Sequence, residues 1–343
     1  MQPTLLALAS LFSQKYSEYE SDFFPKVHKG VGGDIVDALA DPFDFVVVGS
    51  GFAGSFLANR LAESRCMRVL LLEAGTTPTY DMAIPFASLA NLSRYEWGHY
   101  TVPQRKAAKA MKQGMVHLMA GKVLGGDSAV DNGLYVPPNL ADFHRWSYIN
   151  KLNGWSYVEM KPYMFKIPKE TLEKSKGPKN IKDKTVKDTP VAEMKLSKDE
   201  VQDMLRQGGT PNLLSPLKYA WLKAGQDLNY TTIKGDEQSM FHEGGFFIPK
   251  AMAQKGLKMN SAAQFLKRER SNLMIISHAE VTRLLYTPDT SRVVGVEFKD
   301  TLNGKRYHVN ALRETVVSAG AIGSAQLLMQ SGIGPSDVLS SQQ

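Results

Sequence analysis

A continuous apolar run that ends directly in a glycine turn constrains this chain more than any other feature. Phe43 to Val48 is a mostly apolar, β-prone run, and such a run suits a strand buried on both faces of a parallel sheet. The residues that follow it, Gly49-Ser50-Gly51-Phe52-Ala53-Gly54, fit the pattern G-x-G-x-x-G. From Ala53 to Glu63 the apolar residues follow helical spacing, and Arg68 to Leu72 forms a second apolar run. The opening unit is therefore predicted to be strand, helix, strand.

The glycine turn is predicted to bind a dinucleotide. Gly49 permits the tight turn, Gly51 lets a pyrophosphate approach the backbone, and Gly54 lets the helix pack against the sheet. The helix N-terminus adds N–H groups and a partial positive charge for the phosphates. Glu73 closes the second strand nineteen residues after Gly54, where a carboxylate accepts hydrogen bonds from ribose hydroxyls and repels a 2′-phosphate. This unit leaves FAD and NAD open, since both use it; a turn without a ligand is the plain structural alternative.

Composition places the chain among ordinary folded proteins. Its 343 residues allow two domains or one large one, and 43% apolar with 22% charged residues is close to the globular average. The net charge of +7 comes largely from a Lys-rich stretch between residues 161 and 200. That stretch also contains acidic residues, Pro and Gly, which favours a solvated insertion over a nucleic-acid groove.

Other classes of protein are disfavoured by what the sequence lacks. The single cysteine, Cys66, excludes an internal disulfide and a Cys-based metal cluster, and no metal site is predicted. No run of 18 or more apolar residues occurs, so no membrane span is expected. The short apolar run from Thr4 to Phe12 lacks a basic region before it. Localisation therefore stays unassigned, with an extracellular location open.

The C-terminal third is predicted to be rich in strands. An antiparallel meander is expected from four short β-prone runs that turn residues separate: Leu273–Ser277, Val281–Tyr286, Val293–Lys299 and Arg306–Asn310. A further strand, Thr315 to Ser318, leads through Gly320 into a helix.

Two longer motifs make the sequence recognisable. The stretch from Gly121 to Tyr135, with its double glycine, resembles the first signature of the glucose-methanol-choline (GMC) oxidoreductase family, and Gly320 to Pro335 resembles the second. Shorter matches to the insect glucose-dehydrogenase-like branch occur at Trp97–Gln104, Asp142–Trp146 and Ser277–Leu284. The resemblance covers about residues 40 to 335, apart from the Lys-rich stretch, and concerns the N-terminal part of that family.

This resemblance implies an α/β, Rossmann-like FAD-binding fold with an incomplete α+β substrate domain. It implies an N-terminal helix or tail over 1–40, a discontinuous FAD domain at 41–150 and 265–335, and a partial substrate domain at 151–264 with a Lys-rich insertion at 166–200. The implied cofactor is FAD, with Glu73 on its ribose and adenine near Val281. The FAD-binding residues are then expected to be Gly49, Ser50, Gly51, Phe52, Ala53, Gly54, Glu73, Ala74, Val123, Gly125, Gly126, Ser128, Asp131, Asn132, Val281, Ala319 and Gly320.

Two acidic residues depart from the family pattern. Asp127 stands where a small hydroxyl residue is expected after the double glycine, and Asp131 stands where Asn is expected. A carboxylate near a pyrophosphate or an anionic flavin is repelled unless it is protonated or paired. We therefore expect a lowered affinity for flavin, unless Asn132 takes the missing role through a one-residue slip of the loop.

The resemblance implies hydride transfer from an alcohol or sugar CH–OH group to the flavin, with a histidine as proton acceptor. In the family that histidine lies beyond the second signature, and this chain ends at Gln343. No catalytic residue is therefore assigned; among seven histidines, His242 is the least improbable candidate. The expectation is an oxidoreductase chain that is truncated and inactive alone, with a small alcohol or sugar as substrate. Alternatives are a catalytically inactive nucleotide-binding or interaction protein and an NAD-dependent dehydrogenase; the oligomeric state stays open.

Overall fold

The computed structural model describes most of the chain outside its N-terminus and its Lys-rich region. The described residues are 14, 15, 17–20, 24, 27–84, 93–135, 138–164, 217–233, 244–247, 250, 251, 253, 254, 257–266, 270–287, 289 and 292–341. The predicted insertion at 166–200, the apolar run from Thr4 to Phe12, and His242 lie outside them. The chain divides into two compact units: Met1–Asn132 with Met259–Gln343, and Gly133–Lys258.

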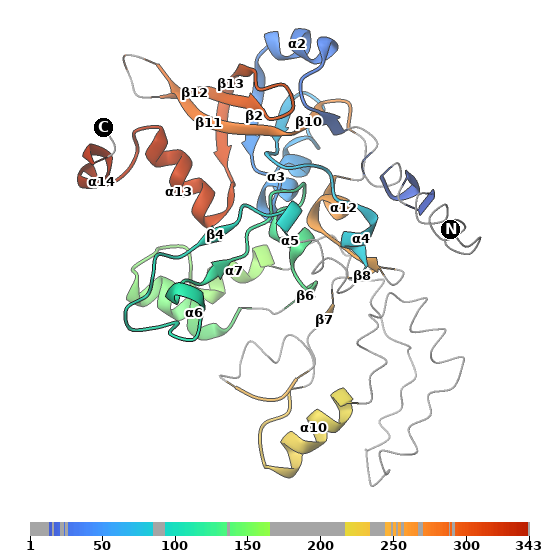
Figure 1. The fold of residues 1–343 in the computed structure, drawn as a ribbon, viewed down its shortest axis with the longest axis vertical. Helices are drawn as coiled ribbons and strands as arrows, with labels where there is room; N and C mark the ends of the chain where they lie inside the picture. Colours follow the sequence, from blue (N-terminus) through green and yellow to red (C-terminus); the bar gives the residue numbers. More distant parts are fainter. Residues whose placement is uncertain are drawn as a thin grey trace. The chain divides into compact units, whose positions relative to one another are not determined.

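A seven-stranded sheet forms the centre of the first unit (Figure 1). Its strand order is β1 (Val27–Lys29), β10 (Leu273–Ser277), β3 (Val69–Leu72), β2 (Phe43–Val48), β13 (Arg306–Val317), β12 (Val293–Asp300) and β11 (Ala279–Tyr286). From β1 to β13 neighbouring strands are parallel, and β13, β12 and β11 pair in antiparallel fashion. The predicted α/β, Rossmann-like fold is confirmed.

The central strands are buried on both faces, which explains why their sequences do not alternate. Val46, Val47 and Leu71 are wholly inaccessible to solvent, as expected for parallel strands that helices cover. One apolar cluster joins β2 and β3 to Leu39 of α2 (Gly33–Ala40) and Leu327 of α13 (Gly320–Gln330). Helix α3 (Phe52–Leu61) follows β2 directly and contacts both β2 and β3.

The predicted four-strand meander is wrong in its first strand, whereas Val281–Tyr286, Val293–Lys299 and Arg306–Asn310 do lie in three strands that pair in antiparallel fashion. Leu273–Ser277 is not antiparallel: β10 lies between β1 and β3 and pairs in parallel with both. Its buried Ile275 and Ile276 suit an interior strand of a parallel sheet better than a meander. The two runs at Arg306–Asn310 and Thr315–Ser318 form one strand, β13, which pairs with β12 first and then with β2. A register irregularity between Ala311 and Glu314 marks the change of partner.

Shorter elements complete the two units. The first unit also contains α4 (Tyr80–Ala83), β4 (His99–Tyr100), a 3-10 turn (Lys112–Gly114), β5 (His117–Leu118), α5 (Asp127–Val130), α12 (Ser261–Phe265) and α14 (Ser336–Ser340). The second contains β6 (Leu134–Tyr135), α6 (Leu140–His144), a π-helical turn (Arg145–Ile149), α7 (Tyr157–Met164), α10 (Leu217–Asp227), β7 (Lys250–Ala251), β8 (Ala253–Gln254) and β9 (Leu257–Lys258).

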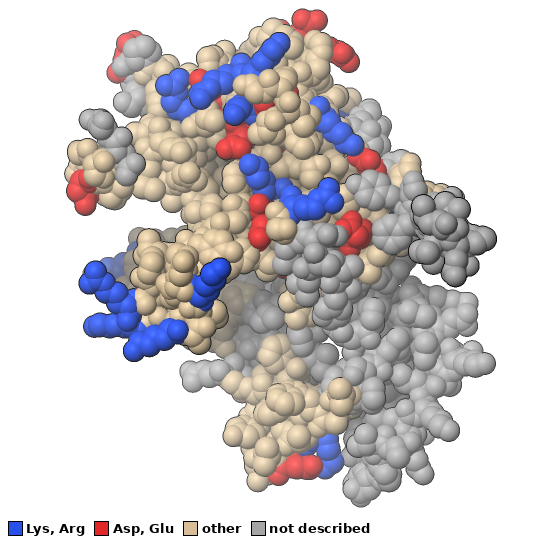
Figure 2. Space-filling view, in the orientation of Figure 1, with Lys and Arg blue, Asp and Glu red and all other residues tan. Residues whose placement is uncertain are grey.

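A cluster of charges ties the three antiparallel strands together. The carboxylate of Glu297 on β12 lies 3.0 Å from His308 Nε2 and accepts hydrogen bonds from Thr282 Oγ1 at 2.9 Å and Arg306 Nη1 at 2.6 Å. Figure 2 shows basic side chains gathered over this meander, with carboxylates among them. The hydrogen bonds from His308 and Thr282, followed by Arg306, lower the pKa of Glu297 to about 2.

This cluster predicts a specific dependence of stability on pH. Because folding depresses the pKa of Glu297, its contribution is complete above its ordinary pKa of 4.5 and is lost as pH falls towards about 2. We expect Glu297→Gln to flatten the fall in unfolding free energy over that window, measured by chemical denaturation at successive pH values. Glu314→Gln, an exposed change on β13, should keep the wild-type slope. Equal slopes in the wild type and in Glu297→Gln would contradict the assignment.

Candidate dinucleotide site

Two glycines of the turn between β2 and α3 are required by close contacts within the chain, and the third faces open space. Gly49 has φ +91°, and a Cβ there would lie 2.5 Å from the carbonyl oxygen of Ser318. A Cβ on Gly54 would lie 1.9 Å from the carbonyl oxygen of Gly49. A Cβ on Gly51 would meet no atom within 4 Å. The chain therefore has room at Gly51 beside the first turn of α3, whose leading N–H groups have no partner within the helix.

Ser50 and Glu73 join the ends of the two strands that carry the site. The Glu73 Oε2 atom accepts hydrogen bonds from Ser50 N at 3.0 Å and Ser50 Oγ at 2.5 Å. Its Oε1 atom accepts one from Gly75 N at 2.8 Å. A carboxylate oxygen accepts about two hydrogen bonds, so Oε1 keeps acceptor capacity for a further donor.

Glu73 is a buried acid that its surroundings hold in place. Burial raises the pKa of this carboxyl, and the hydrogen bonds from Ser50 and Gly75 oppose the rise without cancelling it. Glu73 is only 5% exposed but lines a cavity. A buried acid with acceptor capacity at the carboxyl end of a parallel strand is well placed to receive ribose hydroxyls.

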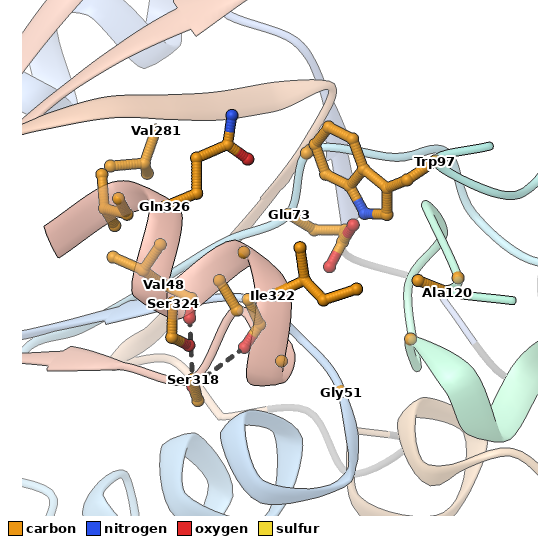
Figure 3. A pocket seen from close by; sticks show the side chains of 18 of the residues that line it. Val48, Gly51, Glu73, Trp97, Ala120, Val281, Ser318, Ile322, Ser324 and Gln326 are labelled. Carbon is orange, nitrogen blue, oxygen red and sulfur yellow. Dashed lines mark hydrogen bonds between the residues drawn. The ribbon is translucent and has the colours of Figure 1, made fainter. Parts of the chain in front are cut away.

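A cavity of about 1360 Å³ opens over the carboxyl ends of β2, β3 and β13, larger than the roughly 300–1,000 Å³ typical of drug-sized ligands. Figure 3 shows Glu73 at its centre, with Gly51 on one side and Val281 on the other. Twelve of the predicted residues line it: Gly49, Ser50, Gly51, Phe52, Ala53, Glu73, Ala74, Gly126, Ser128, Val281, Ala319 and Gly320.

Five other predicted residues do not line this cavity: Gly54, Val123, Gly125, Asp131 and Asn132. Gly54 allows α3 to pack closely, and Val123 is fully buried and bridges to Thr76. Gly125 N donates to Ser50 Oγ at 3.1 Å. Gly54, Val123 and Gly125 therefore lie behind the residues that line the cavity and support them by packing.

The double-glycine loop packs directly against the first glycine turn. Besides the bond from Gly125 to Ser50, a Cβ on Gly126 would lie 2.9 Å from the Cα of Gly51. Ser128 Oγ donates to the Gly125 carbonyl at 2.6 Å and lies 3.0 Å from Ser261 Oγ. Two segments far apart in sequence thus meet beside the N-terminus of α3.

The two unexpected acids occupy different positions. Asp127 is exposed and lines the cavity, and its Oδ1 accepts a hydrogen bond from Gly121 N at 2.8 Å. Asp131 follows α5 and is not among the cavity residues. Only Asp127 is therefore positioned to repel a phosphate or flavin, and the lowered flavin affinity stays a prediction.

Several residues that line the cavity were not predicted from the sequence as site residues. Figure 3 shows Ile322, Ser324 and Gln326 entering from α13 and Trp97 from the opposite wall. Ile322, Ser324 and Gln326 lie inside the second signature and Trp97 begins one of the shorter matches, so the sequence signal was present, but it did not reveal the directions of these side chains. Lys122 Nζ lies 4.1 Å from the Trp97 ring centroid and 3.0 Å from Glu280 Oε2, which anchors this wall to β11.

Two kinds of feature are absent from the part of the chain that the structure describes. Within it, no helix combines the length and apolar character needed to cross a membrane. The same residues contain no cluster of three or more His, Cys, Asp or Glu side chains able to hold a metal ion.

Comparison with known proteins identifies relatives that match most of this chain in sequence. The family model for GMC oxidoreductases matches residues 43–341. Glucose dehydrogenase [FAD, quinone] of Drosophila pseudoobscura pseudoobscura is 33% identical over 87% of this chain and 44% of its own length. Oxygen-dependent choline dehydrogenase of Pseudomonas entomophila is 31% identical over 88% of this chain and 50% of its own length.

Solved structures agree with the fold. Pyridoxine 4-oxidase from Mesorbium loti superposes with a TM-score of 0.64 at 27% identity, covering 87% of this chain and 53% of its own. Formate oxidase gives a TM-score of 0.66 at 22% identity, with 87% and 49% covered. The chain spans about half the length of the curated relatives it matches. The chain, matched from strand β2 onward, therefore belongs to the GMC oxidoreductase family, whose cofactor is FAD.

Proposed function

We propose that this chain binds FAD in the cavity above β2, β3 and β13 and forms the cofactor-binding part of an oxidoreductase that acts on CH–OH groups of alcohols or sugars. The observation that supports it best is the room kept open at Gly51 beside the Glu73 carboxylate. Bound FAD supplies a hydride acceptor to such a reaction. The names of relatives that act on glucose and choline agree with this substrate class.

The cavity residues suggest one orientation for the cofactor. The pyrophosphate is placed at Gly51 and the N-terminus of α3, where N–H groups and the helix dipole favour negative charge. The adenosine ribose is placed at Glu73, and the adenine beyond it, near Val281 and Gln326 (Figure 3). The remaining end of the cavity, near Gly126 and Ser128, is left for the flavin ring.

These residues contribute positioning and exclusion rather than proton transfer. Glu73 orients the ribose, the glycine turn fixes the phosphates, and the double-glycine loop holds both against β2 through Ser50. His99 and His117 line the cavity from the β4–β5 hairpin, and His117 Nε2 lies 3.0 Å from Glu96 Oε2. We assign no proton acceptor to the described residues.

A second candidate, a nucleotide-binding protein without catalysis, is favoured by Asp127 alone. Its carboxylate lines the cavity where the family has a small hydroxyl residue. Such a protein would bind FAD but would leave it oxidised in the presence of alcohols and sugars.

A parallel titration with FAD, FMN and NAD tests the proposal. FMN lacks the adenosine that Glu73 and Val281 are placed to hold, and NAD lacks the flavin. We expect FAD to bind at least about tenfold more tightly than either, which corresponds to about 1.4 kcal/mol. Preferential binding of NAD, or equal binding of FMN and FAD, would defeat the assignment.

A further inference from the structure

The β4–β5 hairpin of the first unit is strongly basic. Residues from Gly98 to Gly126 contain five Lys or Arg and no Asp or Glu. Four of these cations lie at the tip, and all are exposed: Arg105, Lys106, Lys109 and Lys112. Within the described part of the chain none of the four forms an ion pair. This part of the surface therefore carries a positive charge that the protein itself does not neutralise.

The hairpin is held in shape by its own backbone. Its two sides are joined by hydrogen bonds from Trp97 N to Ala120 O, from Thr101 N to Val116 O and from Gln104 N to Gly114 O, each 2.9 Å long. At the tip, Met111 N donates to Ala108 O at 3.0 Å. The tip cations are thus presented by an ordered ribbon.

Apolar side chains accompany the cations. Val102 is 76% exposed, Met111 54% and Tyr100 62%. Burying such side chains away from water is favourable in proportion to their area. The combination of clustered Lys and Arg with aliphatic and aromatic side chains is typical of segments that lie in the headgroup region of anionic membranes.

We propose that this hairpin docks the protein on an anionic lipid surface. The cations attract the lipid headgroups, and Val102 and Met111 enter the boundary between headgroups and acyl chains. A lipid surface is favoured over a nucleic acid because Val102 and Met111, the exposed apolar residues nearest in sequence to the tip cations, are aliphatic and do not stack on bases, whereas stacking platforms characterise single-strand binding. Since Trp97, His99 and His117 at the base of the hairpin line the cavity, docking would bring the cavity wall to the membrane surface.

The test is co-sedimentation with vesicles of phosphatidylcholine alone or mixed with phosphatidylserine. We expect binding only to the mixed vesicles, and a decrease with rising salt as the charges are screened. The double variant Lys106→Gln, Lys109→Gln should bind at least about tenfold more weakly, since each basic residue near an anionic surface contributes roughly fivefold. Val102→Ser with Met111→Ser should weaken the binding that remains at high salt.

Matched controls make the result decisive. Lys299→Gln with Lys305→Gln removes the same charge from exposed positions at the β12–β13 turn and should bind like the wild type. Circular dichroism and FAD titration check that every variant keeps its fold and site. The proposal is overturned by absence of binding to phosphatidylserine vesicles, or by equal loss in hairpin and control variants. Equally tight binding to DNA that ignores the Val102 and Met111 changes would also overturn it, in favour of a polyanion site.

Discussion

Gly51→Val is expected to abolish FAD binding while leaving the fold intact. A Cβ at this position meets no protein atom within 4 Å, and the φ of −59° at Gly51 lies outside the left-handed region that only glycine adopts readily. The new side chain would instead fill the space beside the helix N-terminus where a pyrophosphate would lie. We expect FAD affinity to fall at least about 100-fold, or ~2.7 kcal/mol, measured by titration, with an unchanged circular dichroism spectrum.

Gly54→Val, three residues further on, separates the two roles of the glycine turn. Its Cβ would lie 1.9 Å from the carbonyl oxygen of Gly49, a backbone atom that cannot move without breaking the turn. This variant should lose more than about 4 kcal/mol of stability and fail to fold before any question of binding arises. If Gly51→Val bound FAD normally, the space at Gly51 would not be the pyrophosphate site.

Glu73→Ala is expected to damage both stability and binding. The substitution removes the acceptor for Ser50 N, Ser50 Oγ and Gly75 N in a buried position, and each buried group left without a partner costs about 1–3 kcal/mol. It also removes the acceptor proposed for the ribose hydroxyls. Chemical denaturation and FAD titration should both show the loss, and Glu63→Gln, at an exposed position two residues after α3, should show neither.

Glu73→Gln distinguishes these contributions. The amide keeps one acceptor oxygen but turns an NH₂ group towards backbone donors, so one side of the network faces a donor–donor conflict. We expect an intermediate loss of stability and at least about a tenfold loss of FAD affinity, or ~1.4 kcal/mol. Unchanged FAD affinity in a folded Glu73→Gln protein would remove Glu73 from the site.

The sequence predicted those parts of the fold in which the local residue pattern indicates the same structure that tertiary packing requires. Phe43–Val48 forms β2 with the expected bounds, and its buried half is entirely apolar. Helix α3 begins at Phe52, one residue before the expected start. The run Leu273–Ser277 was misplaced because a short apolar run does not reveal whether its neighbours are parallel or antiparallel. The length of β13 was missed because one strand changes partners midway along its course.

The same distinction holds for the site. Spacing predicted Glu73, Gly49 and Gly51 as site residues, and all three line the cavity, since their positions follow from backbone geometry alone. Val123 and Gly125 were predicted as contacts but lie behind the wall, because in a closely packed loop the sequence does not reveal which face a residue presents. Trp97 and Gln326 were not assigned, since their direction depends on the packing of segments far apart in sequence.

We propose above all that this chain holds FAD between the glycine turn and Glu73. The most direct test is the visible absorption spectrum of the purified, folded protein after incubation with FAD and removal of free cofactor. We predict a flavin spectrum that elutes with the protein, with FAD released on denaturation in nearly equimolar amount. A folded protein that stays colourless under these conditions would contradict it.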